Sequence, residues 1–459
     1  MNRLVAIILP TLFILGLAFL AFPGGPGALL VTTVAALIAL GAFRLYGGED
    51  ARFVTFVFLG GLAARLAFGL FVHAFELRDF FGGDAITYDF LGTQLMYRWT
   101  DAVQVPNPTV EWQLNTLSTG WGMYYLVASL YYVIGENILA AQSLVAVIGA
   151  CTAPMVYFCS LRVFQNRSVA TTSAALVAFF PAFIIWGGQL LKDGPIVFLL
   201  VLAITMVLEL QRKFSYLPLV LLIGSVAGVL SLRFYIFYML VAAIVGSFLI
   251  GVGGSAQAVV RNTIVLVLLG LGLTYLGVTR NANTAFERYA SLAQVQASRA
   301  DLATSAKSGF AGDVDVSTSE GAISAIPIGL VYLMLAPFPW QMTSIRSAIT
   351  GPEVILWWAM IPLMIIGIGW SVRNNLRRAF PILMFSLMLT LAYSVFQGNV
   401  GTAYRQRTQI QVFLFMFMSV GWVLRKEKQE NAKIVKAARH DAVAAALKAR
   451  TAAARSIQS

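Results

Sequence analysis

Long apolar runs recur along almost the whole chain, and they constrain its fold more than any other feature. Clear examples are Leu4 to Phe22, Ile138 to Phe158 and Val354 to Trp370, each close to the roughly 20 residues that an α-helix needs to cross a bilayer. The runs are continuously apolar, with no alternation at period 2, so they predict helices. Because 59% of the residues are hydrophobic and only 11% are charged, we expect an all-α polytopic membrane protein.

The basic residues predict which connections face the cytoplasm. Four short connections carry them, namely Arg44 with Arg52, Arg162 with Arg167, Arg212 with Lys213, and Arg373 with Arg377 and Arg378. By the positive-inside rule these connections are cytoplasmic. Spans are then expected near 4–22, 27–43, 53–74, 138–159, 168–187, 194–211, 217–231, 234–251, 263–279, 353–371, 379–397 and 409–424. About 12 crossings place both termini inside and every basic connection on the same face.

This topology leaves two long connections outside, 75–137 and 280–352. Each contains an apolar stretch of about 14 residues, 121–134 and 325–337, which suits a juxtamembrane helix better than a span. If these stretches do cross, the count is wrong by two. The polar, Ala/Ser/Gly-rich segment 281–324 is expected to be a mobile loop.

The chain divides into a membrane-embedded part, 1–424, and a basic tail, 425–459, which is expected to be a cytoplasmic helix near anionic lipid. Nucleic-acid binding by the tail is disfavoured because no aromatic residues lie among its charges. Two cysteines, Cys151 and Cys159, are interpreted as core residues and not as a disulfide or metal pair. With only His73 and His440 in addition, a histidine-based metal site is not expected.

The segment FFGGDAITYDF, 80–90, places acids just beyond the third predicted span. Gly82 and Gly83 allow a tight turn that presents Asp84 toward a cavity. Asp84 is therefore a candidate catalytic acid or base, and Tyr88 and Asp89 are candidate substrate-binding residues. The alternative is a solvated loop in which Asp84 caps a helix.

A second pair of ionisable residues, Lys192 and Asp193, lies in GGQLLKDGP, 187–195, where the chain re-enters the membrane on the same outer side. Ionisable groups at membrane depth are costly, so both are functional candidates, Lys192 for substrate binding and Asp193 for catalysis. The alternative is a snorkelling lysine beside a helix-capping aspartate.

Three arginines belong to the same side: Arg233 in SLRFY, and Arg405 and Arg407 in QGNVGTAYRQRTQ. Arginine binds phosphate in a bidentate manner and keeps its charge in a low dielectric. Together with the acids, these residues predict a site for an anionic substrate with a proton acceptor nearby. The alternative is that individual arginines anchor to lipid phosphate.

The order of these motifs resembles the C-type (GT-C) membrane glycosyltransferases, in particular the branch of the protein O-mannosyltransferases and the aminoarabinose transferase of lipid A. The likeness runs through GGDAITYD, the segment beginning GWGMYYLVASLYY, and FFPAFIIWGGQLLKDGP. It covers about 53–240 well and the remainder only in architecture. The resemblance implies that Asp84 is the first-loop acid, Asp193 the second-loop acid and 121–134 a juxtamembrane helix. Asp84–Ala85 stands where many members have an acid pair; no cofactor is expected, and the sequence does not support a divalent metal.

The resemblance implies transfer of a sugar from a polyprenyl-phosphate-linked donor to an extracytoplasmic acceptor, a cell-envelope glycan, lipid or protein. The phosphate would bind near Arg233, Arg405 or Arg407, and Asp84 would act as general base. The expected location is a bacterial inner (plasma) membrane. Two other functions remain open: a polymerase or ligase of lipid-linked polysaccharide repeats using Arg405, Arg407 and 281–324, and a transporter of a lipid-linked substrate.

Overall fold

The computed structural model describes residues 2–81, 83–102, 107–115, 120–250, 256–289, 291–304, 308–312, 314–342 and 345–457. These residues are overwhelmingly helical, and the only β-contact among them is a single bridge between Gly309 and Asn399. The predicted all-α class is confirmed. The helices are α1 (Asn2–Leu20), α2 (Gly25–Gly47), η1 (Gly48–Asp50), α3 (Ala51–Ala74), α4 (Asp84–Trp99), α5 (Pro108–Asn115), α6 (Trp121–Ile134), α7 (Ile138–Phe164), α8 (Arg167–Phe179), α9 (Pro181–Gly187), α10 (Asp193–Arg212), α11 (Tyr216–Leu232), α12 (Phe234–Ile250), α13 (Ala256–Tyr275), α14 (Val278–Tyr289), α15 (Leu292–Thr304), α16 (Ser319–Leu335), η2 (Pro339–Gln341), α17 (Ile345–Ala348), α18 (Gly351–Asn374), α19 (Leu376–Phe396) and α20 (Val400–Ile457).

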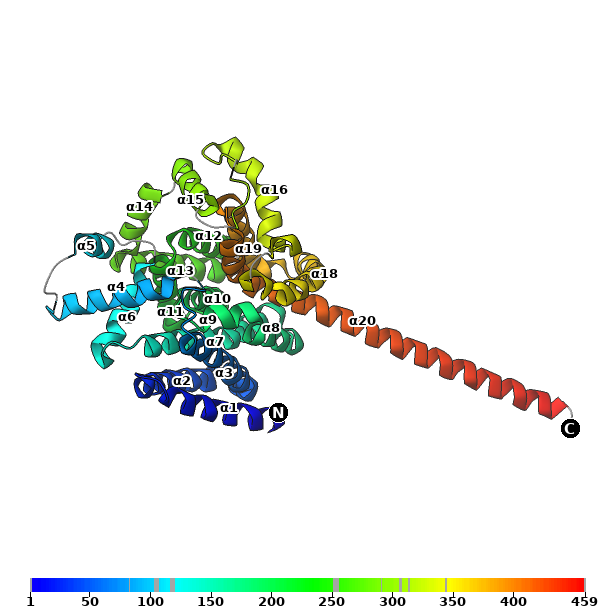
Figure 1. The fold of residues 1–459 in the computed structure, drawn as a ribbon. Helices are drawn as coiled ribbons and strands as arrows, with labels where there is room; N and C mark the ends of the chain where they lie inside the picture. Colours follow the sequence, from blue (N-terminus) through cyan, green and yellow to red (C-terminus); the bar gives the residue numbers. More distant parts are fainter. Residues whose placement is uncertain are drawn as a thin grey trace.

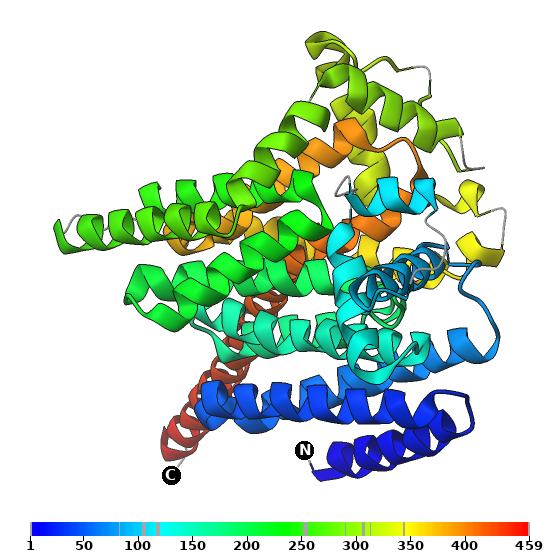
Figure 2. The same ribbon diagram turned by 90° about the vertical axis from the view of Figure 1, so that its left-hand side faces the viewer.

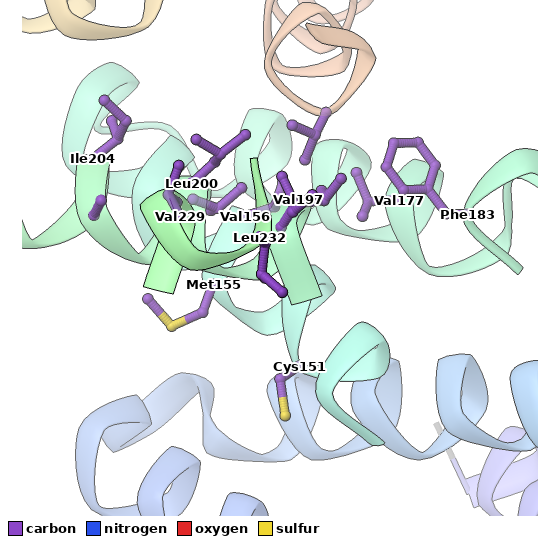
Figure 3. Packing of buried hydrophobic residues seen from close by; sticks show 14 of the residues in the cluster. Cys151, Met155, Val156, Val177, Phe183, Val197, Leu200, Ile204, Val229 and Leu232 are labelled. Carbon is purple, nitrogen blue, oxygen red and sulfur yellow. The ribbon is translucent and has the colours of Figure 1, made fainter. Parts of the chain in front are cut away.

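Helices α7 and α10 and the first part of α20 form the centre of the bundle (Figure 1). In the most apolar 18-residue stretch of each helix, 83% of the residues are buried in α7 and 72% in α10, but only 22% in α13. Many residues of α7 are alanine, serine, glycine or cysteine, and such small side chains let neighbouring helices approach closely. Figure 3 shows Val156 of α7 close to Val197 and Leu200 of α10.

Seven helical stretches of the described residues are long and apolar enough to cross a membrane, or eight if the bent pair α8 and α9 forms one span. The stretch Gly25–Ala74 counts once although it contains α2, η1 and α3. Other predicted spans coincide with the shorter helices α1, α11 and α12. Helices α11 and α12 have 17 residues each, about 26 Å at 1.5 Å per residue, slightly less than the hydrocarbon thickness.

The predicted basic connections gather at one end of the bundle. Arg162 Nε lies 2.5 Å from Glu209 Oε1 at the end of α10, and Arg167 Nη2 lies 3.1 Å from Glu49 Oε2 in η1. The side chain of Asn375 donates to the carbonyl of Val163 at 2.7 Å. Because α10 has 20 residues, its first residue, Asp193, lies about 30 Å from this basic end.

The stretch 121–134 forms α6, which packs against α4 and α11. With 14 residues it is about 21 Å long, too short to cross the hydrocarbon core. Gly92 of α4 permits the contact with α6, since a Cβ there would lie 2.4 Å from a methyl of Val127. Figure 2 shows α4 nearly end-on, while α2 and α13 run across the view, so α4 lies crosswise to them.

The segment 281–324 is not the mobile loop that its composition predicts. It contains α15 and most of α14, and α16 begins at Ser319. The prediction underestimated the helix propensity of its alanine, glutamine, arginine and leucine residues. At the C-terminus, the predicted tail helix is continuous with the last span, because α20 runs unbroken for 58 residues and projects away from the bundle (Figure 1).

Candidate functional site

Four charged residues that are far apart in the sequence meet at the ends of their helices. Asp84 is the first residue of α4, and Asp193 is the first residue of α10. Arg233 lies between α11 and α12, and Arg405 lies in the second turn of α20. The structure thus brings together residues from both predicted outer acid motifs and from two of the predicted arginine positions.

Arg405 connects the two acids. Its Nη1 lies 2.8 Å from Asp84 Oδ2, and its Nε lies 2.6 Å from Asp193 Oδ2. The other carboxylate oxygen of Asp193 accepts a hydrogen bond from Arg233 Nη2 at 3.1 Å. One carboxylate therefore holds two guanidinium groups side by side, which would otherwise repel each other.

The two carboxylates differ sharply in exposure. The side chain of Asp193 is 1% exposed, whereas that of Asp84 is 46% exposed. A buried carboxylate is tolerated only when it is paired and hydrogen-bonded, and Asp193 meets both conditions through Arg233 and Arg405. Asp84 remains accessible to a substrate.

Aromatic and amide side chains surround Arg233 on its inner side. Arg233 Nη1 donates to the hydroxyls of Tyr235 at 3.1 Å and Tyr393 at 3.5 Å. The Tyr393 hydroxyl in turn donates to the side-chain oxygen of Gln409 in α20. These contacts fix the guanidinium of Arg233 relative to α19 and α20.

A buried arginine of α3, Arg65, shapes the approach to Asp193. Its guanidinium donates to the carbonyls of Ala178 at 3.2 Å and Val177 at 3.3 Å, where α8 ends. Pro181 starts α9 at this point, and the two helices meet at a bend of 53°. The break between α8 and α9 leaves these carbonyls without partners inside a helix, and Arg65 supplies donors to them. Helix α9 is followed by 188–193, the segment that leads to Asp193.

A cavity of about 1190 Å³ lies beside the charged cluster. Asp84, Lys192, Arg233 and Arg405 line it, together with aromatic residues that include Trp186. The guanidinium of Arg405 lies 5.5 Å from the Trp186 ring centroid. Two donors in these lining residues, Trp186 Nε1 and Arg405 Nη2, are buried and have no hydrogen-bond partner among the described residues. A wall that carries Lys192, Arg233 and Arg405 suits an oxyanion.

Lys192 extends this wall, and a glycine makes room for it. Gly120 has φ +93°, in the left-handed region, and a Cβ there would lie 3.2 Å from Lys192 Nζ. Burial and then the positive charge of Arg233 lower the pKa of Lys192 from 10.5 to about 7. Lys192 is therefore mainly charged below pH 7 and mainly neutral above it.

This pKa predicts that anion binding weakens as the pH rises. A phosphodiester such as an alkyl methyl phosphate keeps a single charge over the whole range, so only the protein titrates. We expect its affinity to fall by about tenfold, roughly 1.4 kcal/mol, between pH 6 and pH 8.5, because the attraction of the Lys192 ammonium is lost. Lys192→Arg should remove this dependence, since arginine stays charged. Calorimetric titration in nanodiscs at several pH values measures both; an unchanged pH profile in Lys192→Arg would contradict the assignment.

The remaining predicted site residues are placed differently. Tyr88 is buried behind Asp84, and its ring centroid lies 6.0 Å from that of Tyr124. Burial and then the charge of Asp84 raise the pKa of Tyr88. Asp89 faces α6, where it accepts a hydrogen bond from Tyr131. Neither Tyr88 nor Asp89 lines the cavity in the described part of the chain.

Arg407 points away from the cluster although it is two residues from Arg405. It is fully buried, and its Nη1 donates to the carbonyls of Met334 at 3.1 Å and Ala336 at 3.0 Å, at the end of α16. It thus satisfies the open carbonyls of a helix C-terminus and does not belong to the described cavity lining.

Other cavity residues were missing from the sequence-based prediction. Trp186, directly before the Gly-Gly pair, and Tyr235, two residues after Arg233, adjoin predicted motifs, and that proximity was an available signal. Gln294, Ser298 and Asp301 of α15 also line the cavity. Their spacing of four and three residues marks one helix face, a signal that is visible only once 281–324 is interpreted as helical.

Comparison with known proteins adds no family to these observations: no protein-family model matches the chain, and no curated protein matches its sequence.

Proposed function

We propose that this protein is a membrane glycosyltransferase that moves a sugar from a polyprenyl-phosphate-linked donor to an acceptor outside the cytoplasm. One observation carries the proposal: an accessible carboxylate, Asp84, lines the same cavity as three cationic residues, Lys192, Arg233 and Arg405, which suit a phosphate. Such a transferase needs a base for the acceptor hydroxyl and cations for the leaving phosphate.

In the proposed reaction the donor phosphate binds Arg405 and Lys192. Asp84 takes the proton of an acceptor hydroxyl, whose oxygen forms a bond to the anomeric carbon. The bond between that carbon and the phosphate oxygen breaks, and polyprenyl phosphate leaves with the electron pair. Arg405 lies 2.8 Å from Asp84, so it links the base to the phosphate-binding wall.

Asp193 receives a different role from the catalytic one that the resemblance implies. Its side chain is 1% exposed and is engaged by Arg233 and Arg405. It is a positioning residue in this proposal, because it orients the two guanidinium groups and does not touch the substrate.

The position of the cavity in the bundle supports an extracytoplasmic site. The cluster lies at the end of α10 opposite to Arg162 and Glu209, where the basic connections meet. By the positive-inside rule the basic end is cytoplasmic. We therefore propose about 12 crossings of a bacterial inner membrane, with α11 and α12 as two of the shorter spans.

One observation favours the second candidate function, polymerisation or ligation of lipid-linked repeats. Helix α15, from the segment 281–324, lines the same cavity as Arg405. A polymerase would use the same charged wall but make products of increasing length.

Purified protein in liposomes, supplied with a radiolabelled polyprenyl-phosphate sugar and a membrane-extract acceptor, tests the proposal. A transferase converts label from the lipid into an acceptor product of one added sugar, with release of polyprenyl phosphate. A ladder of products would establish the polymerase instead. Movement of the labelled lipid between leaflets without any new glycosidic bond would establish a transporter, a class in which broken helices such as α8 and α9 are common.

A further inference from the structure

A second wall of the cavity comes from α15, far in sequence from the charged cluster. Gln294, Ser298 and Asp301 line the cavity from this helix. Residues spaced by four and three positions share one helix face, and they span about 10.5 Å along the axis. On this side of the cavity, α15 contributes these three polar residues beside two apolar ones, Val295 and Leu302, and no arginine or lysine.

The α15 wall is anchored to the helices that carry Arg405. Arg299, the fully buried residue of α15, donates through Nη1 to the carbonyls of Val395 at 2.9 Å and Gln397 at 2.7 Å. Its Nη2 donates to the carbonyl of Ala311 at 3.2 Å. The carbonyls of Val395 and Gln397 lie at the C-terminal end of α19, where a cation is favoured.

Further hydrogen bonds join α15 and the chain after it to the connection between α19 and α20. Phe310 N donates to Gly398 O at 2.8 Å, and Val400 N donates to Ser308 O at 3.0 Å. The side chain of Asn399 donates to the carbonyl of Leu302 at 3.2 Å. With these anchors, Gln294, Ser298 and Asp301 keep a fixed position relative to Arg405.

The two walls differ in chemistry. The charged wall offers the cationic groups of Lys192, Arg233 and Arg405. The α15 wall instead combines an amide, a hydroxyl and a carboxylate, which together can donate to and accept from hydroxyl groups. Tyr235 and Phe396 also line the cavity, with ring centroids 5.6 Å apart, and offer apolar faces. The volume of about 1190 Å³ exceeds the upper range for a single small ligand.

We propose that Gln294, Ser298 and Asp301 form the acceptor subsite and bind a neutral, polyhydroxylated glycan. This inference rests on the proposed transferase function and adds the chemical class of its second substrate. Three hydrogen-bonding side chains over about 10.5 Å match the successive hydroxyls of two linked sugars. A serine or threonine side chain of a peptide presents one hydroxyl and would leave most of this face unused.

A cysteine protection experiment tests the subsite in the full-length protein in nanodiscs. The native cysteines, Cys151 and Cys159, are buried, so Ser298→Cys can be labelled selectively with a maleimide. Ala297→Cys is the matched control, because Ala297 is exposed and lies outside the described cavity lining. The probes are a panel of neutral oligosaccharides of two to four sugars, a serine- and threonine-containing peptide, and undecaprenyl phosphate.

We expect an oligosaccharide to slow labelling of Ser298→Cys by roughly threefold or more at saturation and to leave Ala297→Cys unchanged. Adding Gln294→Ala and Asp301→Asn to Ser298→Cys should abolish this protection. Protection by the peptide alone, or by no member of the panel, overturns the glycan subsite.

Thermal stabilisation by undecaprenyl phosphate, measured on the same samples, separates this proposal from the function on which it rests. Stabilisation that is lost in Arg405→Gln, without oligosaccharide protection at Ser298→Cys, removes the subsite and leaves the lipid-phosphate site. Absence of stabilisation in the parent protein removes the donor site and with it the proposed function.

Discussion

Asp84→Asn is expected to lower sugar transfer by at least about 100-fold, the usual range for loss of a general base. Asparagine has nearly the same size and still accepts a hydrogen bond from Arg405, but it cannot take the proton of the acceptor. Because the Asp84 side chain is 46% exposed, the free energy of unfolding should change by less than about 1 kcal/mol. Initial transfer rates in liposomes, with thermal unfolding of the same preparations, measure both effects.

Asp79→Asn provides the matched control for this variant. Asp79 is exposed, lies five residues earlier in the same connection, and is not among the described residues of the cavity lining. Its replacement removes the same charge without touching the proposed base, so transfer should stay within about twofold of the parent protein. Equal losses in the two variants, or near-normal transfer by Asp84→Asn, would remove Asp84 from the mechanism.

Much of the charged cluster could be predicted from the sequence because of where its members fall relative to the apolar runs. Asp193 and Arg233 lie directly at the ends of such runs, where an ionisable residue must reach a membrane face or a cavity. Counting the predicted spans from the basic connections then places these residues and Asp84 on the same face of the membrane. Which carboxylate is buried could not be predicted, because that depends on how α10 packs against α20.

Arg407 and Asp89 are two of the predicted residues that lie outside the described cavity lining, and helix geometry explains their positions. Arg407 follows Arg405 by two residues, a rotation of about 200°, so the two side chains leave α20 on opposite sides. Asp89 follows Asp84 by five residues, a rotation of about 140° on α4, and it meets Tyr131. The helical period of 3.6 residues, applied to the sequence, would have placed Arg407 on a different helix face from Arg405, and Asp89 on a different face from Asp84.

The α15 wall was harder to predict from the sequence. Arg299 is 1% exposed and is the buried residue of a helix whose other residues are half-buried or exposed, and two of its acceptors are carbonyls 96 and 98 residues later in the chain. Carbonyl acceptors leave no signature in the sequence, because every residue has one. A composition rich in alanine and serine therefore predicted a mobile loop where an anchored helix lies.

Loss of the Asp193 carboxylate is expected to destabilise the protein by about 3–5 kcal/mol, the usual cost of breaking a buried ion pair. In Asp193→Asn, the guanidinium of Arg233, 4% exposed, keeps its charge but loses its anionic partner, and Arg405 loses one of its two partners. Glu49→Gln is the control at the basic end. Its carboxylate pairs with Arg167 but is 88% exposed, so the loss should be smaller, about 1 kcal/mol or less.

Charged residues from distant parts of the chain meet around the buried carboxylate of Asp193, and a double-mutant cycle tests this central claim most directly. Unfolding free energies in detergent would be measured for the parent protein, Asp193→Asn, Arg405→Gln and the double variant. Because the two side chains meet at 2.6 Å, the double variant should be more stable than the sum of the single losses predicts, by at least about 1 kcal/mol. Losses that add to within about 0.5 kcal/mol would show that Asp193 and Arg405 do not interact and would contradict the site.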